Sequence, residues 1–217
     1  MNKKEKYAFC FQKFAEIMPN PQTELHYENS FHLLVAVILS AQCTDKRVNM
    51  ITPDLFKALP TPKAMANASE NEIFNLIKSC SYPKNKAKHL KNMATMLHNE
   101  FHDEIPDDID EMQKLPGVGR KTANVMAAVV FHKPAMAVDT HVFRVSARIG
   151  LVKNAKTPLE TEKQLTKFIP DEKMHDMHHW LILHGRYTCK AIKPLCNRCK
   201  ITAVCDYFNK NRGIFDK

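Results

Sequence analysis

Residues 115–123 of this chain read Leu-Pro-Gly-Val-Gly-Arg-Lys-Thr-Ala. The residues before them, from about 108, have the spacing of a short helix, and the residues after them continue to about 131 with the apolar period of a longer one. Two glycines within three residues therefore separate two helices. This pattern predicts a helix-hairpin-helix.

The glycines of the turn permit backbone conformations with positive φ and leave its N–H groups without side-chain cover. Together with the start of the second helix, these N–H groups form an anion site suited to a DNA phosphate. We therefore predict that the turn contacts DNA through Gly117, Val118, Gly119 and Arg120.

Lys121 lies in the first turn of the second helix. The positive end of the helix dipole destabilises an ammonium ion there, and burial would add to this effect. A lysine shifted toward its neutral amine can attack a carbon electrophile and form a Schiff base. On local sequence alone, the favoured alternative is a second phosphate-binding cation beside Arg120.

Asp139 precedes another helical segment, Val-Asp-Thr-His-Val-Phe-Arg-Val at 138–145, and occupies its N-cap position. The helix over 119–131 spans about 20 Å, and residues 132–138, nearly extended, can return about 23 Å. Asp139 can therefore lie beside Lys121. A lysine and a carboxylate across a cleft suit displacement at a sugar carbon; the alternative is that Asp139 only caps its helix.

The composition favours an all-α fold. The chain has 217 residues, of which 44% are hydrophobic, with only five glycines against 12 prolines, and it contains no Asn-Gly or Asp-Gly hairpin signal. Its longest apolar runs, 33–39 and 125–131, have seven residues each, whereas a membrane-spanning helix needs about 20. We expect about ten helices in a soluble, cytoplasmic protein that is associated with the nucleoid if bacterial.

The charge is strongly basic, with 32 Lys and Arg against 23 Asp and Glu, a net charge of +9. The segment 190–217 and the cluster Lys84, Lys86, Lys88 and Lys91 are especially rich in lysine and arginine. Such a balance favours a polyanionic partner, most commonly nucleic acid. The alternative for each cluster is a solvated face.

Four of the seven cysteines fall within 17 residues, in the pattern C-x6-C-x2-C-x5-C. Without an export signal, such a group indicates a thiolate-bound metal rather than disulfides, and this spacing favours an iron–sulfur cluster over zinc. Lys190 and Lys193 in the first arm can then meet a phosphate backbone. We expect the other three cysteines to be buried core residues. The predicted ligands are Cys189, Cys196, Cys199 and Cys205.

Several segments together, spanning about 3–210, resemble the endonuclease III family of bifunctional DNA glycosylase/lyases in the helix-hairpin-helix superfamily. They are Leu-Ser-Ala-Gln at 39–42, the segments at 115–123 and 138–145, His-His-Trp-Leu-Ile-Leu-His-Gly-Arg-Tyr-Thr-Cys at 178–189, and the cysteine spacing.

The resemblance implies two helical lobes flanking a DNA-binding cleft. One is a six-helix domain over about 23–133 that carries the helix-hairpin-helix at 108–131. The other combines 1–22 with 134–217 and holds a [4Fe–4S] cluster in the loop 189–205. We expect a monomer that acts on double-stranded DNA containing damaged pyrimidines or abasic sites.

The same resemblance implies roles for individual residues. Lys121 would attack C1′ of an oxidised or ring-saturated pyrimidine nucleotide, form a Schiff base and nick the strand by β-elimination, with Asp139 as the catalytic carboxylate. Gln42 would fill the gap left by the flipped base, and Tyr82 would be the wedge on the other strand, although Ser81 replaces the usual glycine before it. Further matches are His141 and Arg144 as DNA contacts, and Ser40, Asp45 and Thr122 in the base pocket.

Two other functions compete with this interpretation. A monofunctional adenine-mismatch glycosylase of the same superfamily lacks a lysine at the position of Lys121. A non-catalytic iron–sulfur module that binds DNA and senses redox state would not need both Lys121 and Asp139. The presence of both residues favours the bifunctional enzyme.

Overall fold

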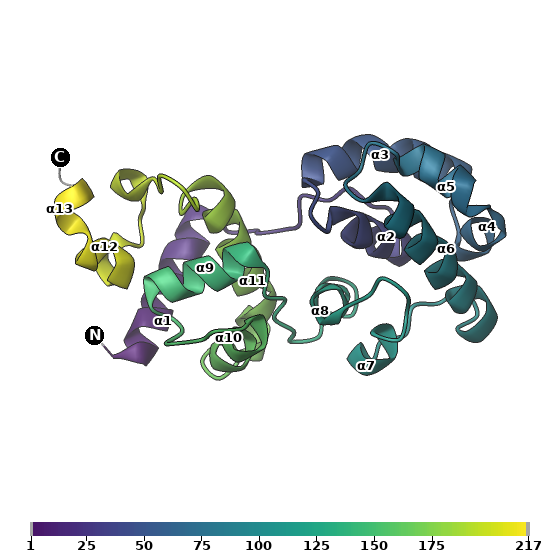
Figure 1. Ribbon diagram of the computed structural model, residues 1–217. Helices are drawn as coiled ribbons and strands as arrows, with labels where there is room; N and C mark the ends of the chain where they lie inside the picture. Colours follow the sequence, from purple (N-terminus) through teal and green to yellow (C-terminus); the bar gives the residue numbers. More distant parts are fainter. Residues whose placement is uncertain (1, 216–217) are drawn as a thin grey trace. The chain divides into compact units, whose positions relative to one another are not determined.

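The computed structural model describes residues 2–215, and within that range it contains helices and no β-strand, so the expected all-α class is confirmed (Figure 1). The chain divides into two compact units. One comprises residues 24–132, and the other combines residues 1–23 with 133–217. No helix in the described part of the chain is long and apolar enough to cross a membrane.

The unit 24–132 is built around α2, Ser30–Ser40. Residues 31–39 of this helix are all buried, as expected for a helix that is apolar on every side. It packs against α3, α6 and α8. The other helices of this unit are α3 Asp45–Ala58, α4 Pro62–Asn67, α5 Glu70–Ile77, α6 Pro83–Glu100, α7 Ile109–Met112 and α8 Arg120–Val129.

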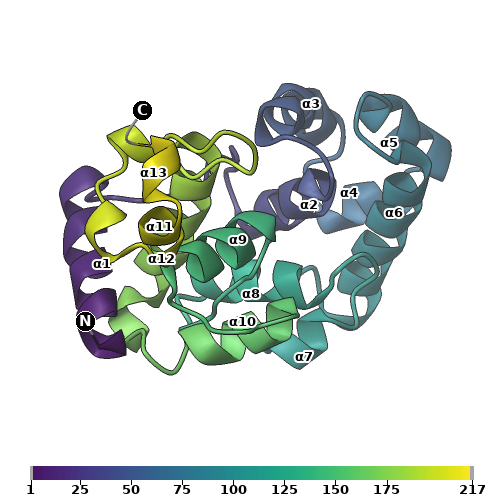
Figure 2. The same ribbon diagram turned by 60° about the vertical axis from the view of Figure 1, so that its left-hand side comes forward.

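The second unit joins the two ends of the described chain. Phe14 stacks on Trp180 with ring centroids 5.9 Å apart, and the Trp180 indole N–H donates to the Met18 carbonyl at 2.8 Å. Both views show α1 beside α11 (Figures 1 and 2). The unit contains α1 Lys3–Ile17, α9 Thr140–Ile149, α10 Pro158–Leu165, α11 Asp171–Tyr187, the 3-10 turns Cys196–Arg198 and Thr202–Val204, α12 Asp206–Lys210 and α13 Arg212–Phe215.

The core of this second unit explains why α1 belongs to it. Tyr7 and Phe14 of α1 are buried in the same apolar cluster as Val142 of α9 and Leu181 of α11. The Tyr7 hydroxyl also donates to the Leu151 carbonyl at 3.1 Å, which satisfies a polar group that is otherwise surrounded by apolar side chains.

Candidate nucleic-acid interface

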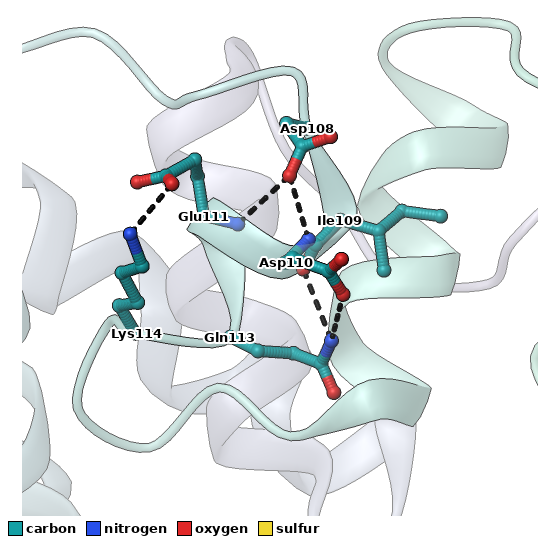
Figure 3. Close-up of polar contacts among 6 residues, drawn as sticks. All are labelled: Asp108, Ile109, Asp110, Glu111, Gln113 and Lys114. Carbon is teal, nitrogen blue, oxygen red and sulfur yellow. Dashed lines mark hydrogen bonds and ion pairs between the residues drawn. The ribbon is translucent and has the colours of Figure 1, made fainter.

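Side-chain hydrogen bonds hold the short first helix of the hairpin (Figure 3). The Asp108 carboxylate caps α7 by accepting from the backbone N–H groups of Asp110 and Glu111 at 2.9 and 3.0 Å. At the other end, the Lys114 ammonium pairs with the Glu111 carboxylate at 2.6 Å. A helix of four residues has too few internal hydrogen bonds to persist alone, so these contacts and the buried Met112 fix the direction in which the chain enters the turn.

The two glycines of the turn differ in their surroundings. Gly117 has φ +83°, as predicted, and a Cβ atom added to it would lie only 2.9 Å from Cβ of His89 on α6. Gly119 has φ −93°, so it does not use the positive φ that glycine permits, and an added Cβ would meet nothing within 4 Å. Gly119 precedes α8 and provides no side-chain cap. The packing within the protein therefore requires glycine at 117 and not at 119.

Lys121 and Arg120 are exposed in the first turn of α8, while Ala123, Met126 and Ala127 bury the other side of the helix. The burial considered for Lys121 is therefore not found in the protein without DNA. The buried face of α8 packs on α2, which holds the start of α8 in a fixed position.

Asp139 is the N-cap of α9, with an extended backbone (φ −95°, ψ −174°). Its carboxylate accepts a hydrogen bond from the Val142 N–H at 2.8 Å. The side chain is half-buried, and the cap fixes one of its oxygens at the start of the helix. Lys121 and Asp139 belong to different units of the chain, so their predicted juxtaposition stays a prediction.

His141 and Arg144 on α9 have partners within their own unit. The Arg144 guanidinium donates to the Gly185 carbonyl at 2.9 Å and the Cys189 carbonyl at 3.2 Å, and it lies 3.2 Å from Nδ1 of His141. Burial lowers the pKa of His141, which favours the neutral ring that can accept from Arg144. Arg144 thus connects α9 to the end of α11 and to the first predicted metal ligand. DNA contact by either residue stays a prediction.

The four predicted ligand cysteines line one pocket together with apolar side chains that include Ile149, Leu195 and Ile201. Burial raises the pKa of Cys199 to about 11 and also raises those of Cys196 and Cys205. Four thiolates facing one pocket need a positive centre to offset this cost. In the described residues, no three His, Cys, Asp or Glu side chains gather as they would around a single metal ion. The residues present fit an iron–sulfur cluster through their donor set, four cysteine thiols from one loop.

Arg148, one helical turn after Arg144, is a residue that the sequence did not single out. Its guanidinium donates to the Cys189 sulfur at 3.5 Å, to the Lys190 carbonyl at 2.7 Å and to the Ala191 carbonyl at 3.0 Å. It also stacks over the Tyr207 ring, 4.6 Å from its centroid. Arg148 therefore fixes the first arm of the cysteine loop. The spacing of four residues from Arg144 is the signal that could have identified it.

The cysteine loop presents its two predicted DNA-binding lysines to solvent. Lys190 and Lys193 are both exposed, and Lys193 adopts a left-handed backbone with φ 51°. The loop is tied to α9 through its carbonyl groups, through Cys189 and through the Cys205 thiol, which donates to the Arg148 carbonyl at 3.4 Å, so these ties do not use either lysine side chain.

Gln42 and Tyr82 lie in two loops of the unit 24–132, after α2 and before α6. Both are exposed and both have a left-handed backbone, with φ 53° and 54°. The buried ammonium of Lys86 on α6 joins the bases of the two loops: it donates to the carbonyls of Leu39 and Ala41 at 2.8 and 2.6 Å, at the end of α2. Interpreting Lys86 as part of a solvated basic cluster is therefore wrong.

The three predicted base-pocket residues come from α2 and from two helices that pack on it, α3 and α8. The Ser40 hydroxyl donates to the Val37 carbonyl at 2.8 Å, which occupies its proton within the helix. Asp45 and Thr122 are half-buried in the first turns of α3 and α8. Whether these side chains line one base pocket stays a prediction.

Comparison with known proteins places this geometry in a family. The model for the HhH-GPD superfamily of base excision DNA repair proteins matches residues 35–171. Endonuclease III of Rickettsia prowazekii is 48% identical, over 91% of this chain and 93% of the relative. Endonuclease III of Escherichia coli K12 is 41% identical, over 97% of this chain and 99% of the relative.

A solved structure extends the match to three dimensions. It is described as a trapped endonuclease III–DNA covalent intermediate, and it superposes with a TM-score of 0.92 at 42% identity, covering 98% of this chain and 100% of the other. The sequence match and the fold agree over nearly the whole chain. This chain therefore belongs to the endonuclease III family of the HhH-GPD superfamily of base excision DNA repair proteins.

Proposed function

We propose that this chain removes oxidised or ring-saturated pyrimidines from double-stranded DNA and then cleaves the strand at the resulting abasic site. The observation that carries this proposal is the exposed Lys121 at the start of α8, directly after a glycine turn that presents backbone to solvent. A similar protein, described as an endonuclease III–DNA covalent intermediate, supports the formation of a covalent bond to DNA.

In this proposal Lys121 is the nucleophile. Its neutral amine attacks C1′, the bond from C1′ to the base breaks, and the base leaves with the electron pair of that bond and takes up a proton. Loss of the amine proton and opening of the sugar give the Schiff base. Removal of a proton from C2′ then expels the 3′ phosphate oxygen and cleaves the strand.

Asp139 is the proposed carboxylate partner. It accepts the proton that the Lys121 amine loses and stabilises the positive charge that develops at C1′. Its role as the cap of α9 supports this function, because the hydrogen bond from Val142 orients one oxygen and holds the group at a fixed place in its unit.

The binding roles follow from exposure and backbone geometry. The turn at 117–119 receives a phosphate of the damaged strand through the N–H groups of its two glycines, with Arg120 beside it; the Val118 N–H instead donates to the Leu115 carbonyl at 3.0 Å. Gln42 and Tyr82 enter the duplex from two neighbouring loops, where an aromatic ring can stack between bases. The proposed DNA contacts also include Lys190 and Lys193 in the cysteine loop, and His141 and Arg144 on α9. The flipped base is received by Ser40, Asp45 and Thr122.

We assign the unit 24–132 as the hairpin domain and the discontinuous unit as the iron–sulfur domain. In the latter, Cys189, Cys196, Cys199 and Cys205 would hold a [4Fe–4S] cluster, which supplies a rigid cross-link for a short loop with little apolar core of its own. Arg148 and the Ile201 N–H, which donates to the Cys199 sulfur at 3.4 Å, orient the thiolates. A zinc-bound loop is the alternative, and visible absorption of the purified protein distinguishes the two.

We further propose that the enzyme is a cytoplasmic monomer acting on nucleoid DNA.

Borohydride trapping tests the proposed chemistry. The parent protein is incubated with a duplex that carries one oxidised pyrimidine, and sodium borohydride reduces any Schiff base to a stable adduct. An adduct with the parent and none with Lys121→Ala is expected, while Lys63→Ala, a control that removes an exposed lysine of α4 in the same unit, should trap like the parent. Base release without an adduct would indicate a monofunctional glycosylase, and DNA binding without base release a non-catalytic module.

A further inference from the structure

Two cysteines outside the cysteine loop lie together beneath the loops that carry Gln42 and Tyr82. Cys43 is half-buried in the turn after α2, and Cys80 is buried at the end of α5. Both are free thiols. The Cys80 sulfur lies at the end of α2, 3.4 Å from the Leu39 carbonyl and just before the turn that carries Cys43, and each thiol shifts the pKa of the other as neighbouring groups do. The chemistry proposed above uses neither of them.

The pair lies next to a positive charge. The Lys86 ammonium is 3.2 Å from the Cys80 sulfur, and the Cys80 thiol donates to the Leu39 carbonyl at 3.4 Å. An ammonium ion stabilises a thiolate, which is the nucleophilic form of cysteine. Lys86 therefore both holds the two loops and supplies the electrostatic condition for thiol reactivity.

The two thiols differ in a way that divides their roles. Burial raises the pKa of Cys43, but hydrogen bonds from the Ser81 backbone and the Cys80 side chain, together with the charge of Lys86, outweigh burial and lower its pKa below the ordinary value. Burial raises the pKa of Cys80. A partly exposed thiol that ionises readily, beside a second thiol, is the arrangement of a redox-sensitive pair.

We propose that Cys43 and Cys80 form a peroxide-sensitive thiol pair whose disulfide joins the Gln42 loop to the Tyr82 loop. The Cys43 thiolate attacks an oxygen of hydrogen peroxide, an S–O bond forms, the O–O bond breaks, and hydroxide leaves as water after taking up a proton. The Cys80 sulfur then loses its proton and attacks the Cys43 sulfur; the S–S bond forms and the S–O bond breaks to release a second water. The two thiols lose two electrons, and the peroxide gains them.

The disulfide changes both loops. Its S–S bond of about 2.05 Å is far shorter than a thiol–thiol hydrogen bond, so the turn after α2 and the end of α5 must move together. Cys80 also loses its hydrogen bond to Leu39. The consequence for DNA rests on the proposed function, in which Gln42 and Tyr82 enter the duplex. We expect the oxidised protein to bind a duplex with an abasic site about tenfold more weakly, because base stacking tolerates little displacement of an inserted ring.

Peptide mapping tests the thiol pair without reference to DNA. The full-length protein is treated with hydrogen peroxide, remaining thiols are alkylated, and the protein is digested with trypsin, which separates the two cysteines at Lys46 and Lys78. The expected product is one cross-linked pair of peptides that has lost two hydrogen atoms and that separates again on reduction. Cys10→Ala, which removes a fully buried thiol, should retain the cross-link. The proposal would be overturned if Cys43 were oxidised without a link to Cys80. It would also be overturned if both thiols stayed reduced and were therefore alkylated.

Fluorescence anisotropy on a duplex with a stable abasic-site analogue tests the consequence. The oxidised parent is compared with the reduced parent and with peroxide-treated Cys80→Ala, which reports any effect of peroxide on the cysteine loop. Weaker binding by the oxidised parent alone supports the proposal. Equal binding by all three proteins would overturn the claim that the disulfide weakens DNA binding. If the reduced parent itself does not bind, the proposed function is refuted, whereas the peptide map still decides whether the thiols pair.

Discussion

Replacing each glycine of the hairpin by alanine should separate a residue that the fold requires from one that a ligand requires. In Gly117→Ala, a left-handed backbone costs a residue with a side chain roughly 1–2 kcal/mol. The new Cβ lies 2.9 Å from Cβ of His89, an atom that cannot rotate away, and overpacking of this kind costs about 1–3 kcal/mol. The free energy of unfolding should therefore fall by about 2–5 kcal/mol, and Tm by about 4–20 °C.

Gly119→Ala is the matched control, because its backbone is in a region open to all residues and its Cβ meets nothing within 4 Å. Its stability should change by less than about 1 kcal/mol. If the turn receives a phosphate, however, the added methyl group stands between the N–H groups and the ligand, and DNA affinity should fall about fivefold, equal to about 1 kcal/mol.

Urea unfolding and binding to a duplex with an abasic-site analogue measure the two effects separately. A Gly117→Ala protein as stable as the parent would refute the argument from φ and His89. A Gly119→Ala protein that binds DNA like the parent would remove this glycine from the proposed phosphate site.

Three further predictions rest on other residues. Lys86→Met should lower the free energy of unfolding by about 2–4 kcal/mol in urea titrations, because the carbonyls of Leu39 and Ala41 lose a charged donor; an unchanged midpoint would contradict this. Burial lowers the pKa of His179 to about 4 from an ordinary 6.5, so the unfolded chain takes up a proton first, and stability should fall by up to about 3 kcal/mol as the pH drops from 6.5 to 4; His179→Leu should show a shallower loss. Lys193→Ala should weaken binding to all DNA sequences about equally and reduce the slope of log affinity against log salt by roughly one, whereas a sequence-dependent loss would indicate base contact.

The hairpin could be predicted because its signals are local. Two glycines, a proline and the periods of the flanking helices suffice to locate the turn. The different surroundings of Gly117 and Gly119 could not be predicted, because they depend on the approach of His89 from α6. That approach is set by packing between segments far apart in the sequence.

The burial of Lys86 shows a different limit. Lysines at 84, 86, 88 and 91 form a pattern that is typical of a solvated face, yet position 86 lies on the same stripe of α6 as the buried Leu90, Met93 and Leu97. The helical period placed position 86 on the buried face of α6, but the charge of lysine favoured an exposed position. The carbonyl groups that accept from Lys86 belong to α2, which the sequence alone could not place beside α6.

The catalytic pair shows the limit set by distance along the chain. The arithmetic of helix length allows Asp139 to return to Lys121, but it does not fix the direction of the connecting residues. The cysteines needed no such step, because their spacing within one loop already brings them around one pocket.

The docking of α1 onto α11 sets an order for folding during synthesis on the ribosome. Phe14 and the Met18 carbonyl meet Trp180 only after more than 160 further residues have been made, and the Tyr7 hydroxyl meets Leu151 after more than 140, so α1 emerges early and docks late. The segment 24–132, which is continuous in sequence, can complete its own core in that interval. The cysteine loop is made after Trp180, so its four cysteines leave the ribosome when the unit 24–132 can already be folded. During this interval the apolar face of α1 is exposed to aggregation and to chaperones.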